Sequence, residues 1–221
     1  MLMRSIFSAC VLLLVTLGSG VLHAAEATEA AESAKPFLHP LFTDHMVFPR
    51  DHAAPVWGWT VPHGQVQASL ATAHASTVAD ADGRWQLALG PLPAGGPYEL
   101  VIDGPQRVVR SDVLIGDVWL FCGQSNMEYG VAGAEGGGDE LAQASAVRGL
   151  RLLHLGHRLA AEPCSVPPGA AALWQPPSPS AVAGFSAVAW FTSRRLASEL
   201  DVPIGAVACA WSGANIRGWM S

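Results

Sequence analysis

Ser125 directly follows an apolar segment, and its type and place suit nucleophilic chemistry. The preceding run, Val113–Cys122, is largely apolar and is bounded by Gly123. Such a run is typical of a strand that a parallel sheet buries on both faces. A serine hydroxyl exposed at the end of that strand could attack an acyl group, and the serine backbone N–H could bind the developing oxyanion. On spacing alone, the Gly123–Met127 segment also fits an ordinary structural turn.

Three predicted strands alternate with two predicted helices from Ser111 onward. The strands are Val113–Cys122, Leu150–Leu155 and Ile204–Ala210, and the helices are Asp139–Val147 and Ser186–Leu200. This alternation indicates a parallel α/β sheet. Ligands of such sheets bind at the carboxyl ends of the strands. Here those ends are the Gly123–Met127 and Trp211–Ile216 loops.

Helix boundaries and one long connection can also be predicted from this part of the sequence. Asp139 and Ser186 are the expected N-caps of the two helices, and Pro203 is the expected terminator of the second. The connection His157–Gly184 is long and rich in proline. Loops of that length are usually functional or mobile.

The segment Phe37–Arg110 predicts a small all-β module. Short runs of β-forming residues recur at about ten-residue spacing between turn signals, as in a β-sandwich. The runs are Met46–Phe48, Val56–Trp59, Val66–Leu70, Trp85–Leu89 and Tyr98–Ile102. Asp82-Gly83 predicts a tight two-residue hairpin turn. Three tryptophans could line a sugar-binding face, although core packing is favoured in a module this small; they are Trp57, Trp59 and Trp85.

Composition and charge exclude several classes of protein. The chain has 221 residues, of which 50% are hydrophobic and 14% charged, which argues against intrinsic disorder. The formal net charge is −6, and Lys35 is the single lysine among 12 basic residues. The sequence contains no run of basic residues, so we expect neither a nucleic acid nor an anionic membrane as partner.

Met1–Ala25 has the layout of a secretory signal peptide. Arg4 precedes the apolar stretch Ile6–Leu17, which is too short to span a bilayer comfortably. We expect cleavage near Ala24–Ala27 and a periplasmic or secreted protein with no membrane association beyond export. An uncleaved N-terminal anchor is the alternative. Loss of Arg4 would leave a net charge of 11 − 18 = −7. Residues 26–36 then form a low-complexity spacer.

The cysteines predict neither a disulfide framework nor a zinc site. Cys10 leaves with the signal peptide, and an odd number without a CxxC motif remains: Cys122, Cys164 and Cys209. Cys122 and Cys209 each close an apolar run and are expected to be buried small hydrophobes. Cys164 lies in the proline-rich loop, and the pairing of the three stays open. No cluster of histidine, aspartate and glutamate has metal-ligand spacing, so we expect chemistry without a metal or cofactor.

The segment Phe121–Glu128 closely resembles the nucleophile block of the sialate O-acetylesterases, a branch of the SGNH (GDSL-like) hydrolase superfamily. Further segments resemble the same family: Leu41–Phe48, Pro55–Trp59, Asp82–Trp85, Ile115–Trp119, Phe185–Trp190 and Val202–Gly205. The resemblance implies a small β-sandwich-like module at residues 37–110. It also implies the first part of a flavodoxin-like parallel α/β domain of the SGNH hydrolases at residues 111–221.

The resemblance also implies roles for individual residues. Ser125 corresponds to the nucleophile and first oxyanion N–H. Gly213 corresponds to the second oxyanion N–H, where a glycine would permit close approach. Gln124, Asn126 and Arg217 are candidates for the substrate loops. Two residues depart from the family pattern, since Ser212 replaces a usual glycine and Arg217 stands where many relatives have glutamate.

Part of the family machinery has no counterpart in this sequence. The family supplies an oxyanion asparagine and a D-x-x-H block later in the chain, but none of the eight histidines has an aspartate three residues before it. His154 and His157 are the histidines of the α/β region, and neither is favoured as a substitute base. General-base help is typically worth about 10²–10⁴-fold, so a serine without it is a weak nucleophile. The sequence therefore reads as the amino-terminal portion of an esterase.

Three interpretations of the function follow. The resemblance implies an exported serine esterase that removes O-acetyl groups from sialic acid or a related carbohydrate through an acetyl-enzyme. A second interpretation keeps this chemistry but takes acetylated xylan as substrate. A third treats the chain as a non-catalytic carbohydrate-binding or remnant protein, which the absent D-x-x-H block favours. The expected partner is an acetylated carbohydrate, and the oligomeric state stays open.

Overall fold

A computed structural model describes residues 35–157 and 172–219 of the chain. The residues from Pro36 onward form one compact unit. The predicted signal peptide at Met1–Ala25 and Cys164 both lie outside the described residues. Among the described residues, no helix is long and apolar enough to cross a membrane.

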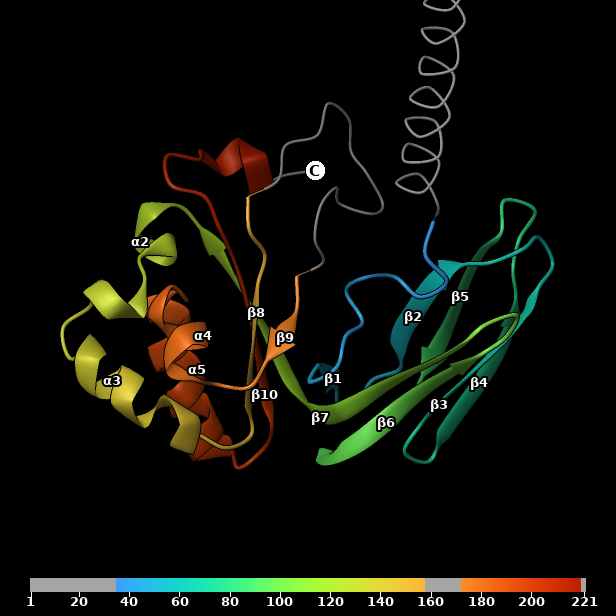
Figure 1. Cartoon of the computed structure of the whole chain (residues 1–221), viewed down its shortest axis with the longest axis horizontal. Coiled ribbons are helices and arrows are strands. Elements are labelled where there is room, and N and C mark those ends of the chain that lie inside the picture. Colours follow the sequence, from blue (N-terminus) through green and yellow to red (C-terminus); the bar gives the residue numbers. More distant parts are fainter. Residues whose placement is uncertain (1–34, 158–171, 220–221) are drawn as a thin grey trace, which may run out of the picture. The chain divides into compact units, whose positions relative to one another are not determined.

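Strand β7 (Arg107–Gly123) is 17 residues long and belongs to both halves of the main sheet. Its first part pairs antiparallel with β6 (Gly95–Asp103), and its last part pairs in parallel with β10 (Ile204–Ala210). Figure 1 shows β7 running between the two halves without a break. The chain therefore does not separate at residue 110, where the sequence predicts a module boundary.

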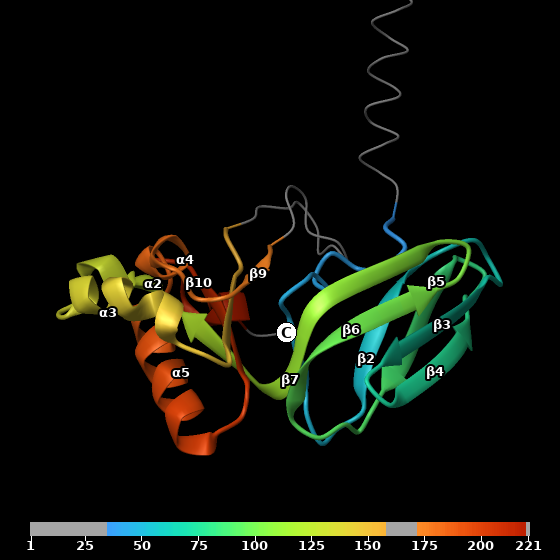
Figure 2. The same cartoon turned by 60° about the horizontal axis from the view of Figure 1, so that its bottom comes forward.

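The antiparallel half of the sheet has the strand order β4-β3-β6-β7. It comprises β3 (Gln65–Leu70) and β4 (Ala73–Val78), and a short strand, β1 (Val47–Pro49), pairs in parallel with β7. A separate sheet of β2 (Ala54–Trp59) and β5 (Arg84–Leu89) packs against it through one apolar core. Figure 2 shows these strands from a second side. Strand β4 was not expected, because its AHASTV sequence carries no large apolar alternation.

The three tryptophans of this module belong to its core. Trp85 is 1% exposed and Trp59 is 6% exposed. Trp57 is half-buried against the same core, with its ring 4.8 Å from that of Phe42. The core interpretation is confirmed for Trp85, which points between the two sheets, and for the buried Trp59. Trp57 and Trp59 lie on the opposite face of β2, where His39 packs against both rings, so the three tryptophans share no exposed sugar-binding face.

The predicted Asp82-Gly83 hairpin is wrong. Strands β4 and β5, which flank this turn, lie in different sheets, so the turn carries the chain across the sandwich. The Asp80 carboxylate accepts the backbone N–H groups of Asp82 and Arg84, and Gly83 alone has a positive φ of 75°. The sequence shows that a turn is needed here, but not which strands it joins.

The parallel half of the sheet has the order β7-β10-β8-β9, with β8 at Leu150–His154 and β9 at Trp174–Gln175. Its strands β7, β10 and β8 are parallel, as predicted. Three helices gather on one face of it: α3 (Gly137–Gln143), α4 (Pro179–Ala183) and α5 (Ala187–Leu200). They cover a second apolar core that includes Phe121 and Trp190. The α/β class predicted from the sequence is confirmed.

The cap of α5 is confirmed and the cap of α3 is wrong. The Ser186 side chain accepts the N–H of Ala189 at 3.1 Å, and α5 ends two residues before Val202-Pro203. Helix α3 begins at Gly137, and its N-cap is Gly136, which has a left-handed φ of 71°. Asp139 therefore lies in the first helical turn. The glycine run allows the helix to begin at a left-handed residue, without a capping side chain.

The last part of β7 has one open edge. Residues Asp117–Gly123 pair with β10 on one side, and no described strand pairs with them on the other. Val118, Trp119 and Leu120 are 40%, 45% and 64% exposed. The strands of a parallel sheet are normally covered on both faces. The described sheet therefore leaves apolar side chains exposed on the strand that leads to Ser125.

Candidate active site

Ser125 lies at the carboxyl end of β7, at the first position of the short helix α2 (Ser125–Glu128). The helix is closed by Glu128 N–H donating to the Gln124 carbonyl at 2.9 Å. The Ser125 hydroxyl is exposed and donates to Gln124 Oε1 at 3.2 Å. Ser125 is therefore exposed just after the carboxyl end of its strand, as predicted.

The two loops predicted to form the site lie side by side. Gly123 and Ala210 are register partners at the ends of β7 and β10, and Trp211 N–H donates to the Gly123 carbonyl at 3.0 Å. A Cβ on Gly123 would lie 2.9 Å from the Met127 Cβ, so a glycine lets α2 turn back tightly against the strand. This turn fixes Ser125 beside the Trp211–Ala214 segment.

Gly213 occupies a turn that only a glycine adopts without strain. Its φ is 79°, and Ala214 N–H donates to the Trp211 carbonyl at 3.0 Å. No atom lies within 4 Å of the place a Cβ would take. The positive φ by itself gives a reason for glycine at this position. The close approach of a substrate to Gly213 stays a prediction. No described residue accepts a hydrogen bond from the Gly213 N–H, which leaves this donor open to a ligand.

A cluster around Glu128 joins both loops to the end of β8, and we call it the Glu128 cluster. It comprises Glu128, His157, Trp211 and Ser212. Glu128 Oε2 accepts the Ser212 N–H at 2.5 Å, and Glu128 Oε1 lies 2.9 Å from His157 Nε2. The His157 ring stacks on Trp211 with centroids 4.1 Å apart and planes 8° from parallel. Sequence reasoning missed this cluster, because its members come from three distant segments.

The segment after α2 is anchored to the start of α5. Ala187 N–H donates to the Tyr129 carbonyl at 2.8 Å, and Val131 N–H donates to the Phe185 carbonyl at 3.0 Å. The Ser186 hydroxyl also contacts Met127 Sδ at 3.6 Å. The segments Phe121–Glu128 and Phe185–Trp190, which both resemble the family, therefore pack against each other next to Ser125.

The three substrate-loop candidates lie on the two loops. Gln124 accepts the hydrogen bond of Ser125, and Asn126 is exposed with no side-chain hydrogen bond to a described residue. Arg217 is exposed in a short 3-10 helix, Ile216–Trp219, and its N–H donates to Asn215 Oδ1 at 2.9 Å. Within the described residues, no hydrogen bond or ion pair joins Arg217 to the Ser125 loop.

Neither histidine of the region acts on Ser125 in the described structure. His154 lies at the end of β8, in a hollow of about 240 Å³ where its ring meets Phe185 edge-on at 6.3 Å. His157 binds Glu128 and the Ala210 carbonyl. Within the described residues, Ser125 therefore has no hydrogen bond to a histidine.

Cys122 and Cys209 face each other across β7 and β10 as register partners, and both are free thiols. Cys122 is exposed and Cys209 is half-buried, so the expectation of two buried residues is wrong. The uncovered face of β7 is the reason. Burial raises the pKa of the Cys209 thiol, and the neighbouring Cys122 raises it further.

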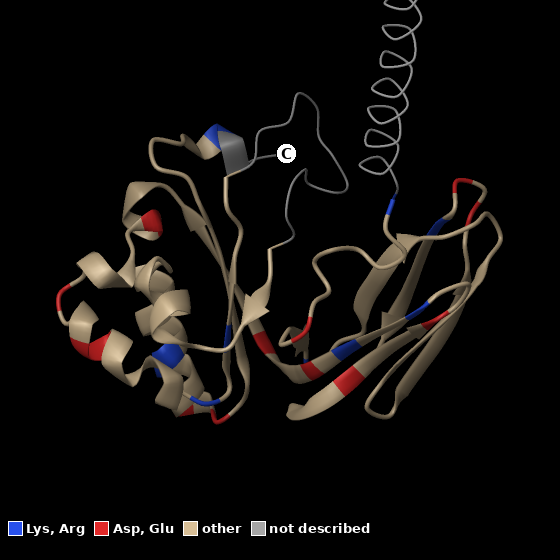
Figure 3. Ribbon diagram, viewed as in Figure 1, with Lys and Arg blue, Asp and Glu red and all other residues tan. Residues whose placement is uncertain are grey.

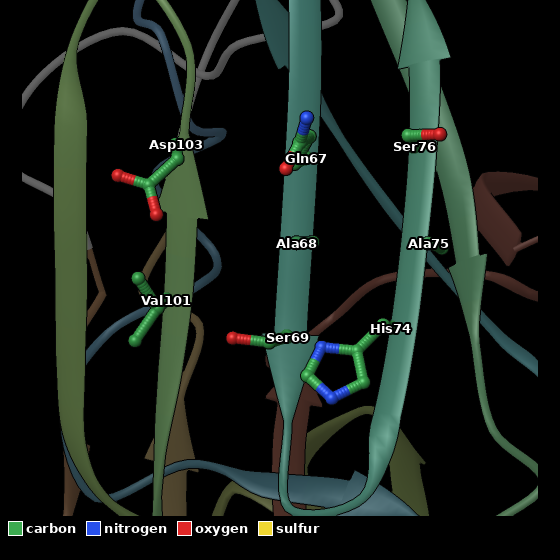
Figure 4. Close-up of a pocket in the computed structure, with 8 residues that line it drawn as sticks. All are labelled: Gln67, Ala68, Ser69, His74, Ala75, Ser76, Val101 and Asp103. Atoms are coloured by element: carbon green, nitrogen blue, oxygen red, sulfur yellow. The ribbon is translucent and has the colours of Figure 1, made fainter.

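A further hollow lies away from these loops, on the outward face of the antiparallel half. It has a volume of about 380 Å³ and a polar lining from β3, β4 and β6 (Figure 4). Gln67 faces Ser76 and Asp103 across the strands, and Ser69 faces His74. No hydrogen bond joins Ser69 to His74 there. The hollow is open, and nothing in it activates a nucleophile.

Charged residues do not single out either loop. Figure 3 shows arginines and acidic residues spread over both halves of the described chain, without a basic stripe. The acidic residue on the serine's own helix is Glu128, whose carboxylate accepts the Ser212 N–H and contacts His157. Among the described residues, no three metal-ligating side chains lie together.

Ser125 and the Gly213 turn both lie at the carboxyl ends of parallel strands, as expected for a hydrolase of the SGNH type. The chain has the fold of the SGNH-like carbohydrate acetylesterases. It is similar to a solved structure described as a novel carbohydrate acetylesterase from Xanthomonas citri, with a TM-score of 0.77 and 35% identity. That match covers 84% of this chain and 43% of the other.

Sequence comparisons identify the family more narrowly. Residues 115–221 match the family described as "Carbohydrate esterase, sialic acid-specific acetylesterase". The chain is 30% identical over 194 residues to the sialate O-acetylesterases of Homo sapiens and Pongo abelii, across 80% of its own length. The chain is thus similar to the sialate O-acetylesterases over most of its length. It spans 37% of the length of these two relatives.

Proposed function

We propose that this chain carries the nucleophile side of a carbohydrate O-acetylesterase active site. The observation that carries the proposal is the pairing of the two loops, which puts the exposed Ser125 hydroxyl beside a turn with an unused Gly213 N–H. The similarity to the sialate O-acetylesterases and to a carbohydrate acetylesterase suggests the reaction, which is the hydrolysis of acetyl esters on a carbohydrate.

Each group has a defined part in this mechanism. Ser125 Oγ attacks the acetyl carbonyl carbon, and the C–O bond to the sugar breaks as the sugar oxygen takes up a proton. The backbone N–H groups of Ser125 and Gly213 bind the oxyanion of each tetrahedral intermediate. Water then attacks the acetyl-Ser125 ester, releasing acetate and restoring the hydroxyl. No cofactor takes part in these steps.

The proton acceptor is assigned to polypeptide beyond the described residues. The curated relatives are much longer than the part matched here, and the open edge of β7 is a place where further strands would pair. The family pattern supplies an aspartate and a histidine as D-x-x-H, together with an oxyanion asparagine. Without them, the non-catalytic interpretation applies to the isolated chain, because Ser125 has no described base.

The proposed substrate is O-acetylated sialic acid, and acetylated xylan is the alternative. Both esters present the same acetyl group to Ser125, so the choice depends on the residues around the sugar. Gln124, Asn126 and Arg217 are the exposed candidates for that contact. Acetate release from the two substrates, measured side by side, discriminates between them.

We propose that the protein is exported. The support is the signal-peptide layout of Met1–Ala25, with Ala25-Glu26-Ala27 as an A-x-A cleavage pattern at its end. Amino-terminal sequencing of protein from the cell envelope should find a start between Ala25 and Glu29. A retained Met1 would contradict export by cleavage.

The nucleophile is tested by covalent labelling. A fluorophosphonate probe followed by peptide mass spectrometry should modify Ser125, and Ser125→Ala should abolish both the label and any acetate release from 4-nitrophenyl acetate. Ser198→Ala is the matched control, because Ser198 is an exposed serine on α5 whose hydroxyl bonds to the Arg195 carbonyl. Labelling that persists in Ser125→Ala would show that the serine is a structural turn residue.

A further inference from the structure

Within the described part of the chain, Glu128 is the one side chain that bonds the nucleophile helix to the glycine turn. Its Oε2 accepts the backbone N–H of Ser212, the residue next to Gly213, at 2.5 Å. Its other oxygen, Oε1, lies 2.9 Å from His157 Nε2. The Glu128 side chain is 30% exposed, so this contact is only partly screened by water.

The glycine turn needs such a restraint. Trp211, Ser212 and Gly213 are all exposed, and no apolar side chain of the turn is buried. The backbone holds it by two hydrogen bonds, from Trp211 N–H to Gly123 and from Ala214 N–H to Trp211. Neither bond engages the Ser212 N–H. The bond from Ser212 N–H to Glu128 holds the Trp211–Ser212 peptide, which directly precedes the peptide that carries the Gly213 N–H.

The geometry excludes a simpler role for Glu128 as a general base. One of its oxygens is occupied by the Ser212 amide and the other by His157. The Ser125 hydroxyl donates to Gln124 instead. A base must lie within hydrogen-bond reach of the proton that it removes, and Glu128 is engaged elsewhere.

We propose that Glu128 is a positioning residue that aims the Gly213 N–H at the oxyanion, and that His157 holds the carboxylate in place. His157 can hold the carboxylate because its ring contacts Glu128 through Nε2 and stacks on the Trp211 ring. The inference rests on the proposed function, since it gives the turn a place in the same acyl transfer. Oxyanion donors act by being preorganised, so a donor that drifts loses much of its effect.

The direct test measures solvent exchange of the Ser212 amide by NMR in the chain and its variants. Glu128→Ala should speed this exchange about ten- to hundredfold, as expected for loss of a hydrogen bond to a charged group. Glu128→Asp should behave like Glu128→Ala, because the shorter side chain keeps the charge but withdraws the acceptor. Glu128→Gln should retain most of the protection, since its amide oxygen still accepts the bond.

Glu199→Ala is the matched control, because Glu199 forms an exposed ion pair with Arg195 on α5. It should leave the Ser212 amide unchanged. Thermal unfolding of each variant shows whether it is folded, and Glu128→Asp is measured if Glu128→Ala does not fold. Unchanged exchange of the Ser212 amide in a folded Glu128→Ala or Glu128→Asp variant overturns the proposal.

A kinetic measurement separates this inference from the proposed function. Where turnover depends on Ser125, Glu128→Ala should lower kcat with little change in KM, because the oxyanion forms only in the transition state. Turnover that does not depend on Ser125 contradicts the proposed function, and the exchange measurement still decides the role of Glu128. A Glu128→Ala effect on KM alone would count against positioning.

Discussion

Gly116 lies where the two halves of β7 meet, and its replacement by alanine tests how closely β7 and the start of β10 must approach. A Cβ on Gly116 would stand 1.9 Å from the carbonyl oxygen of Pro203 and 2.6 Å from its carbonyl carbon. Both are backbone atoms, so no side-chain rotation relieves the overlap. Gly116→Ala must therefore move Pro203 and the strand that follows it.

The expected cost can be worked from these contacts. Overpacking of a close-packed interior typically costs about 1–3 kcal/mol. Asp117 N–H also donates to the same Pro203 oxygen, at 2.9 Å, and losing that bond adds about 0.5–1.5 kcal/mol. The sum is roughly 1.5–4.5 kcal/mol, a substantial part of the roughly 5–15 kcal/mol that stabilises a whole domain.

The assay is urea unfolding of the purified chain, followed by circular dichroism and tryptophan fluorescence. Gly138→Ala is the matched control, because Gly138 is exposed in α3 and no atom lies within 4 Å of its Cβ position. An alanine there should leave stability unchanged or raise it by about 0.5–1 kcal/mol. A Gly116→Ala chain with the unfolding midpoint of the parent would refute the close approach of β7 to Pro203.

Two further predictions concern titratable groups. Burial of the Asp112 carboxyl opposes its ionisation, but hydrogen bonds and charge from His45 and Arg151 outweigh this and lower its pKa below 3.8. Its contribution to stability is therefore present above about pH 4 and is lost as the pH falls through the lowered pKa. Asp112→Asn should reduce stability at pH 7 in urea unfolding, and a deficit that does not shrink towards pH 3 would contradict the assignment. Alkylation by iodoacetamide at neutral pH should modify the exposed Cys122 faster than Cys209, whose pKa is raised by burial; equal rates by peptide mass spectrometry would count against this.

The Asp112 network shows how the two halves of the main sheet are joined. Asp112 Oδ2 lies 2.7 Å from His45 Nδ1 and accepts a hydrogen bond from Arg151 Nη2 at 2.9 Å. His45 and Asp112 both have positive φ, at 64° and 53°, which is uncommon for residues other than glycine. The contact thus brings together the loop before β1, the middle of β7 and strand β8.

In the described part of the sheet, the unpaired edge of β7 leaves large apolar side chains exposed next to Ser125. Trp119 and Leu120 are exposed beside the site, although a strand in this position is normally buried. An unpaired apolar edge also favours association with other chains. Any strand paired with this edge would cover these side chains.

Local signals in the sequence identified most of the elements around the site. The apolar run before Gly123, the strand at Ile204–Ala210 and the Ser186 cap depend on neighbours within a few residues, so they can be read without the fold. The nucleophile block was equally local, because Ser125 must follow its strand directly. The sequence also indicated what it lacks, since no histidine is preceded by an aspartate at the family spacing.

Contacts between distant segments were decided by the tertiary structure alone. Glu128 and Ser212 are 84 positions apart, and nothing in the spacing of either residue marks the bond between them. The continuity of β7 across residue 110 and the turn at Asp80–Gly83 depend on which strands pair, and the exposure of Cys122 depends on what covers its face. The local pattern sets which segments become strands and turns, whereas their partners are fixed only when the whole chain has packed.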